Sequence, residues 1–168
     1  MAEQLGDWVR THTCGALRTS DLDTEATLLG WVHRVRDLGG VLFIDIRDRE
    51  GVSQVVFRDN DELLAQAKRL RSEFVVGVRG LVERRSPDTV NPKLATGDVE
   101  ILARDLRVLN EARTPPFQIA EDTPVSEDVR LKYRYLDLRR PRLQGNIGLR
   151  HKVALDRKST RLNSSHVS

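Results

Sequence analysis

Cysteine is almost absent from this chain of 168 residues, because Cys14 is the only one. An intrachain disulfide and a cysteine-based zinc cluster are therefore excluded. No run of 18 apolar residues occurs either, so the sequence predicts no membrane-spanning helix. The first residues, Met1-Ala2-Glu3-Gln4, lack the basic and then apolar layout of a secretory signal. These absences predict a cytoplasmic protein.

Sequence motifs for catalysis are also missing. Neither a phosphate-cradling GxxxxGK(S/T) loop nor a GxSxG nucleophile turn occurs. His12, His33 and His151 show no metal-ligand spacing, and the acidic residues form no pair suited to acid–base chemistry. The residues alone predict a binding module with no catalytic residue, no metal site and no bound cofactor.

Charge is distributed unevenly along the chain. The net charge is +3. Residues 1–110 hold 16 basic and 18 acidic residues, whereas residues 129–155 hold eight basic residues and one acidic residue. The total charge is therefore a poor guide to nucleic-acid binding, and the position of each charge matters more.

Alternating apolar positions and turn-forming residues predict strands at 27–36, 41–47, 52–58, 74–85 and 98–109. Residues 59–74 have helical spacing, and Asp59, Asn60 or Asp61 can cap that helix. Three strands, a helix and two strands are the order of an OB-fold, an all-β five-stranded Greek-key barrel. A different small α+β sheet is the alternative.

Beyond the barrel at 1–110, residues 111–125 read as a linker that contains Pro115-Pro116. Residues 126–140 predict a helix that Ser126 caps and Pro141 stops, and a further helix begins near Asn146. Residues 126–155 are therefore interpreted as the truncated start of another domain.

The last segment, "DRKSTRLNSSHVS" at 156–168, has no apolar period. Its first eleven residues match the in-frame translation of a common sequencing-adapter oligonucleotide. We interpret 156–168 as non-native sequence and expect the natural protein to continue past Leu155. A disordered polar tail is the alternative that fits the same composition.

One face of the predicted sheet combines an aromatic ring with polar groups. Phe43 shares its face with Asp45 and Arg47, because side chains alternate along a strand. We group with them Gln54 on the next strand, and Arg34 and Arg36 on the strand before. Such a set suits single-stranded nucleic acid, because the ring stacks on a base, the amide reads a base edge and the arginines hold phosphates. In the alternative, a loop covers Phe43 and the arginines at 34, 36 and 47 are solvated partners of nearby aspartates.

Four segments carry a family resemblance: "THTCGALR" (11–18), "GWVHRVRDLGGVLFIDIRDREGVSQVVF" (30–57), "LATGDVEI" (94–101) and "EDVRLKYRYLDLRRP" (127–141). Together they resemble the amino-terminal part of bacterial-type aspartyl-tRNA synthetases. The resemblance implies an OB-fold anticodon-binding domain, followed by a linker and the helical start of a class II α+β catalytic domain. It also implies that the full-length enzyme activates aspartate with ATP and Mg²⁺ and transfers it to tRNA(Asp).

The resemblance also assigns roles to residues. Phe43 matches the aromatic residue that stacks on the middle anticodon base, and Gln54 matches the side chain that reads it. Arg34 and Arg36 match arginines beside the anticodon loop, and two further anticodon-side positions correspond to Arg85 and Glu100. The implied partner is the anticodon stem-loop of tRNA(Asp).

The three class II motifs would lie beyond Leu155. We therefore expect this fragment to be inactive alone, and the family's homodimer, ATP and Mg²⁺ to belong to the full-length enzyme. The alternative is a free-standing OB-fold protein that binds single-stranded nucleic acid without catalysis.

Overall fold

The structure is a computed structural model that describes residues 3–164, with side chains up to residue 157. The chain divides after Thr114 into two compact units.

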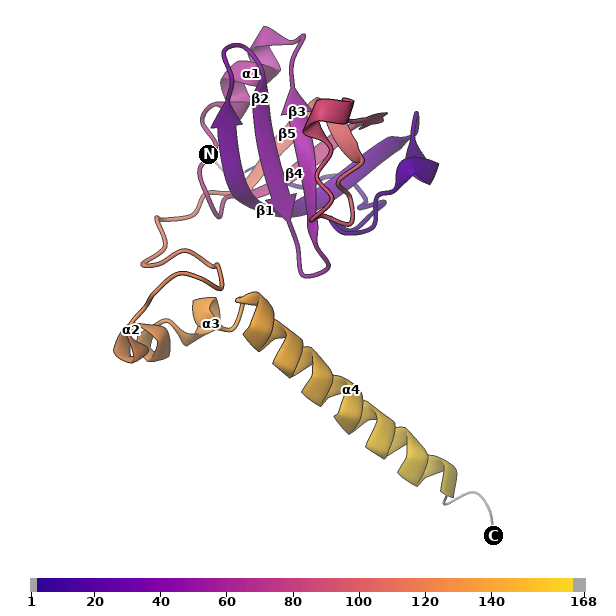
Figure 1. Ribbon diagram of the computed structural model, residues 1–168, viewed down its shortest axis with the longest axis vertical. Coiled ribbons are helices and arrows are strands. Elements are labelled where there is room, and N and C mark those ends of the chain that lie inside the picture. Colours follow the sequence, from indigo (N-terminus) through magenta and orange to yellow (C-terminus); the bar gives the residue numbers. More distant parts are fainter. Residues whose placement is uncertain (1–2, 165–168) are drawn as a thin grey trace. The chain divides into compact units, whose positions relative to one another are not determined.

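The first unit is a closed barrel (Figure 1). Its strands follow the order β1-β2-β3-β5-β4, in which β3 and β5 run parallel and every other pair is antiparallel. This confirms the predicted OB-fold with one helix between the third and fourth strands. The elements are β1 (Glu25–Asp37), β2 (Leu42–Arg47), β3 (Val52–Phe57), α1 (Asp61–Ala67), β4 (Val75–Arg84) and β5 (Val99–Asn110), with short 3-10 turns η1 (Thr19–Asp21) and η2 (Pro87–Thr89).

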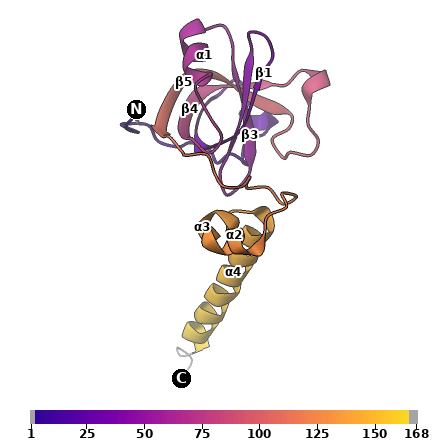
Figure 2. The same cartoon turned by 90° about the vertical axis from the view of Figure 1, so that its left-hand side faces the viewer.

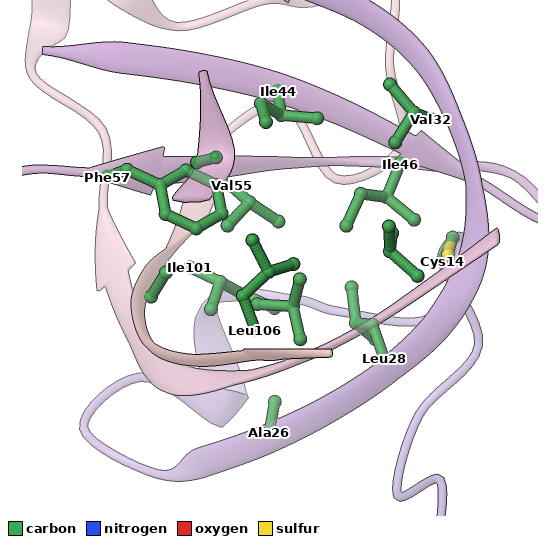
Figure 3. Packing of buried hydrophobic residues seen from close by; sticks show 14 of the residues in the cluster. Cys14, Ala26, Leu28, Val32, Ile44, Ile46, Val55, Phe57, Ile101 and Leu106 are labelled. Carbon is green, nitrogen blue, oxygen red and sulfur yellow. The ribbon is translucent and has the colours of Figure 1, made fainter. Parts of the chain in front are cut away.

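Alternating aliphatic residues fill the barrel interior (Figure 3). On β2, Leu42, Ile44 and Ile46 are at most 1% exposed, whereas the residues between them are half-buried. The barrel can close tightly because Gly80 has no side chain: a Cβ there would collide with the carbonyl oxygen of Leu102 on β5. Burial of this apolar surface supplies most of the stability of the fold.

Helix α1 closes one end of the barrel (Figures 1 and 2). Asn60 is its N-cap and accepts a hydrogen bond from the backbone N–H of Leu63 at 3.0 Å. The helix ends at Ala67, so the predicted span 59–74 is too long. After Ala67 the chain continues in tighter turns, in which the N–H groups of Arg69 and Leu70 donate to the carbonyls of Gln66 and Ala67. Glu73, with a φ of +70°, then turns the chain toward β4, and its N–H donates to the Val32 carbonyl at 2.7 Å.

The N-terminal segment covers the outer face of β4 and β5. Trp8 is 6% exposed, and its ring lies between the guanidinium groups of Arg79, at 4.6 Å, and Arg107, at 4.5 Å. Farther toward the N-terminus, Glu3 donates its backbone N–H to the carbonyl of Val108 at 2.7 Å. This side of the barrel is therefore occupied by the protein's own chain.

The second unit contains α2 (Glu127–Lys132), α3 (Arg134–Asp137) and α4 (Pro141–Ser164). The prediction of one helix over 126–140 is wrong, because the chain leaves helical geometry at Tyr133, with φ −108° and ψ 45°. The break brings Arg130 to Asp137, whose carboxylate is fully buried and accepts hydrogen bonds from Arg130 at 2.9 Å and Arg134 at 2.7 Å.

Helix α4 begins at Pro141 rather than near Asn146. Proline favours the first helical position, because its φ is already helical and its missing N–H would lack a partner there. The helix continues into the segment that we interpret as non-native. Residues 165–168 lie outside the described residues, and the origin of 156–168 stays a prediction. Within the described part of the chain, no helix is long and apolar enough to cross a membrane.

Candidate nucleic-acid interface

Strand pairing gathers the predicted residues on the outward face of β1, β2 and β3. Arg34 of β1 pairs with Asp45 of β2, and Arg36 pairs with Phe43. Asp45 then pairs with Gln54 of β3. Because paired residues point to the same side of a sheet, all five side chains share this face.

A β-bulge in β1 adds a residue that the sequence pattern did not place there. The register shifts between Val32 and Arg34, and the imidazole Nδ1 of the intervening His33 lies 3.0 Å from Nη1 of Arg47. A guanidinium only donates, so His33 accepts at Nδ1 and carries its proton on Nε2. Burial and the nearby Arg47 lower the pKa of His33, which keeps the ring neutral. In the sequence, the only signal for the position of His33 is an interruption in the alternation of side chains along this strand.

Arg47 pairs with a glutamate, whereas the alternative interpretation assumed a solvated pair with a nearby aspartate. It donates to both carboxylate oxygens of Glu73, at 2.6 and 2.8 Å, and its side chain is only 12% exposed. The ion pair of Arg47 with Glu73 therefore holds the loop before β4 against β2. Arg47 is thus not available to a ligand.

Arg36 is the centre of a polar network on the outward face. Its Nη2 donates to Asp45 Oδ1 at 3.0 Å and to Gln54 Oε1 at 2.9 Å. Its guanidinium carbon also lies 5.9 Å from the centre of the Phe43 ring, within range of a cation–π interaction. The one arginine therefore fixes the aromatic ring, the carboxylate and the amide relative to one another.

The network continues from β3 to β5. Gln54 donates through Nε2 to Glu100 Oε2 at 2.7 Å, and the two residues are 4% and 9% exposed. Parallel pairing of Val55 with Ile101 brings these neighbours together, although they are 46 residues apart in the chain. Buried polar groups such as these need partners, and here they satisfy each other.

Arg85 lies at the edge of the network and is 4% exposed. Its Nε donates to the carbonyl of Val99 at 2.9 Å, but within the described part of the chain its buried Nη2 has no hydrogen-bond partner, and neither has Nε of Arg36. Burial lowers the pKa of Arg85, and the charge of Glu100 opposes that shift. An unpaired buried donor costs about 1–3 kcal/mol, so each of these two guanidinium groups would be stabilised by an additional acceptor.

The structure thus places Gln54 in direct contact with both Arg36 and Glu100, and Phe43 lies against Arg36. Arg34 lies exposed on the same face, and Arg85 lies near Glu100 without a hydrogen bond to it among the described contacts. The arrangement offers a half-buried ring, an amide and a cation on one sheet surface.

A closed five-stranded barrel with such a face is the architecture of a nucleic-acid-binding OB-fold. Residues 26–109, half of the chain, match the tRNA anti-codon family, described as the OB-fold nucleic acid binding domain, and the chain belongs to this family. The aspartate–tRNA(Asp/Asn) ligase of Syntrophotalea carbinolica is 54% identical over 156 residues, which cover 92% of this chain and 26% of that protein. The aspartate–tRNA ligase of Geobacillus kaustophilus is 52% identical over 146 residues, covering 86% of this chain and 25% of that protein.

The chain therefore spans about a quarter of the length of these relatives. The resemblance to aspartyl-tRNA synthetases, drawn from four sequence segments, is confirmed. Among solved structures, asparaginyl-tRNA synthetase from Pyrococcus horikoshii in complex with asparaginyl-adenylate has a TM-score of 0.76 and 23% identity over 94% of this chain and 35% of that chain. An OBody bound to hen egg-white lysozyme has a TM-score of 0.55 and 28% identity over 62% of this chain and 96% of that chain. The first likeness shows the fold alone.

Proposed function

We propose that this chain is the anticodon-recognition part of an aspartate–tRNA ligase. The observation that carries the proposal is the buried contact of Gln54 with Arg36 and Glu100, next to Phe43, on the outward face of an anticodon-family barrel. The names of the relatives support aspartate as the amino acid of the full-length enzyme.

Each group has a physical role in this proposal. The ring of Phe43 stacks on an unpaired anticodon base, a contact of about 1–3 kcal/mol. Gln54 still has one amide N–H and one lone pair for the Watson–Crick edge of that base. Arg34 and Arg36 attract the phosphates of the loop. Arg85, directly after β4, and Glu100 on β5 complete the site.

The full-length enzyme is proposed to activate aspartate with ATP and Mg²⁺ and to transfer it to tRNA(Asp). Its catalytic residues and its dimer-forming motif would belong to sequence outside this chain. We accordingly propose a barrel at 1–110, a linker at 111–125, the start of the catalytic domain at 126–155 and a non-native segment at 156–168. In this proposal the fragment binds neither ATP nor Mg²⁺, the homodimer belongs to the full-length enzyme, and the fragment acts in the cytoplasm as part of translation.

The test is equilibrium binding of the chain to two RNA hairpins that differ only at the middle anticodon base. Anticodon recognition predicts tighter binding of the tRNA(Asp) sequence by about tenfold or more, because one well-placed base contact discriminates by about 1–3 kcal/mol. Equal affinity for both hairpins would support the alternative, a single-strand-binding OB-fold without base choice. An aminoacylation assay of the chain alone should yield no aspartyl-tRNA.

A further inference from the structure

The β-bulge of β1 turns one additional side chain toward the outward face. Before the bulge, Val32 is fixed by the segment that leads into β4: its N–H donates to the carbonyl of Phe74 at 2.9 Å, and its carbonyl accepts from Glu73 at 2.7 Å. The register with β2 resumes only at Arg34, so His33 is the extra residue. Bulges commonly re-aim a side chain next to a functional site. Here the bulge places His33 directly beside Arg34.

A buried ion pair determines how the His33 ring is oriented. Arg47 donates to both carboxylate oxygens of Glu73, and the two side chains are 12% and 7% exposed. Such a two-point contact holds the guanidinium plane in one position. Nη1 of this guanidinium lies 3.0 Å from Nδ1 of His33. Because a guanidinium cannot accept, Nδ1 is the acceptor and the ring proton lies on Nε2.

The other edge of the His33 ring carries a free donor. The side chain is exposed, and among the described residues its Nε2–H has no hydrogen-bond acceptor. Burial of part of the ring and the charge of Arg47 lower the pKa of His33, so the ring is neutral near pH 7 and keeps this tautomer. The outward face therefore holds an oriented, uncharged N–H donor next to the exposed cation of Arg34.

We propose that His33 is a further RNA-binding residue, whose Nε2–H donates to an oxygen of the RNA backbone, either a ribose 2′-hydroxyl or a phosphate. Both oxygens accept hydrogen bonds, and both belong to the strand that the neighbouring Arg34 attracts. The contact rests on the proposed function, because it requires the loop to lie along this face. It carries no base information, so it positions the RNA without selecting its sequence.

The experiment compares two substitutions that each keep one edge of the imidazole. In His33→Asn the short amide can still accept from Arg47 at the place of Nδ1, but no donor reaches the place of Nε2. In His33→Gln the longer amide brings an N–H to the place of Nε2. Fluorescence anisotropy gives the affinity of the full 168-residue chain for the tRNA(Asp) anticodon hairpin. His33→Asn should bind about threefold to tenfold more weakly than the wild type, and His33→Gln within about twofold of it.

Two controls define the contact. His12→Asn is the matched variant, because the His12 ring contacts the Thr11 hydroxyl at 2.8 Å in the segment before β1, off the three paired strands. This control should leave the affinity unchanged. Hairpins with 2′-deoxyribose in the loop identify the acceptor: the loss in His33→Asn disappears if the acceptor is a 2′-hydroxyl and persists if it is a phosphate.

Equal affinity of His33→Asn and the wild type would overturn the contact. A loss in His33→Gln that matches or exceeds the loss in His33→Asn would overturn it as well, because the retained donor would then have no effect. The proposed function is tested separately by hairpins that differ at the middle anticodon base. If the wild type does not discriminate between them, that function fails, while the two variants of His33 still test its contact with the backbone.

Discussion

Asp48 accepts a hydrogen bond from the backbone N–H of Cys14 at 2.8 Å and so ties the segment before β1 to the turn between β2 and β3. The other carboxylate oxygen accepts from the backbone N–H groups of Glu50 at 2.8 Å and Gly51 at 3.1 Å. The Asp48 side chain is only 6% exposed. A single side chain thus satisfies three backbone donors that the turn and the crossing segment leave without strand partners.

Asp48→Ala should therefore lower the free energy of unfolding by about 1–3 kcal/mol, because it leaves three backbone N–H groups, two of them in part-buried hydrogen bonds, without their acceptor. Urea unfolding followed by tryptophan fluorescence measures the change. Asp48→Asn should lose less, because its amide oxygen can still serve the turn. Equal stability of Asp48→Ala and the wild type would mean that water replaces the carboxylate at no cost.

Phe43→Ala should weaken binding of the anticodon hairpin by about 1–3 kcal/mol, because a stacked base loses its aromatic partner. Phe43 is half-buried at the surface of the barrel, so its loss should change stability less than the loss of an inward-facing residue. Phe43→Tyr, which keeps the ring, should bind within a few-fold of the wild type. Fluorescence anisotropy with labelled hairpin gives both affinities, and an unchanged affinity of Phe43→Ala would exclude this ring from the site.

Arg34→Gln should weaken binding of all hairpins to a similar extent, because an exposed arginine at the rim of the face contacts phosphate rather than a base. The dependence of log Kd on log salt should become shallower by about 0.7–0.9, as expected for one lost phosphate contact. Arg104→Gln on β5, more than half exposed, is the matched control and should not change the slope. A loss limited to one hairpin sequence would instead show that Arg34 reads a base.

The carboxyl group of Asp137 should make the stability of the second unit depend on pH. Hydrogen bonds from Arg130, together with the nearby charge of Arg134, hold the pKa of the Asp137 carboxyl below its ordinary value. In the unfolded chain the ordinary value of about 3.9 applies. The resulting stabilisation is therefore fully present above about pH 4 to 5 and is lost as the pH falls through the lower folded pKa.

Asp137→Asn should lower the thermal midpoint of the helical signal at neutral pH, and the gap from the wild type should narrow below about pH 4. Circular dichroism at 222 nm follows this transition. Glu121→Gln is a suitable control, because Glu121 makes an exposed ion pair with Arg142 and contributes little. A difference in thermal midpoint between Asp137→Asn and the wild type that stays constant with pH would contradict the role of the Asp137 charge.

The strands and the grouping of polar residues on the outward face could be predicted from the sequence because both depend on local alternation. Leu42, Ile44 and Ile46 on one side and Phe43 and Asp45 on the other follow from a period of two residues. The same rule placed Arg34 and Arg36 correctly, since both lie beyond the bulge at His33.

Features that depend on contacts between distant segments could not be predicted in this way. The bond from Gln54 to Glu100 requires the parallel pairing of β3 with β5, which no local pattern encodes. The packing of Trp8 over β4 and β5 likewise depends on contacts between segments that are distant in the sequence. The helix break at Tyr133 was missed because it accompanies the contact of Arg130 with the buried carboxylate of Asp137, which helical spacing does not encode.

The most direct test of the central claim is a nitrogen–proton NMR titration of the chain with the tRNA(Asp) anticodon hairpin. Binding through the outward face of β1, β2 and β3 predicts large shifts for the backbone amide of Phe43 and the side-chain amide of Gln54. It also predicts little change for the indole N–H of Trp8, which lies on the covered side. Shifts centred on Trp8 and Arg107, with Phe43 and Gln54 unmoved, would contradict the account.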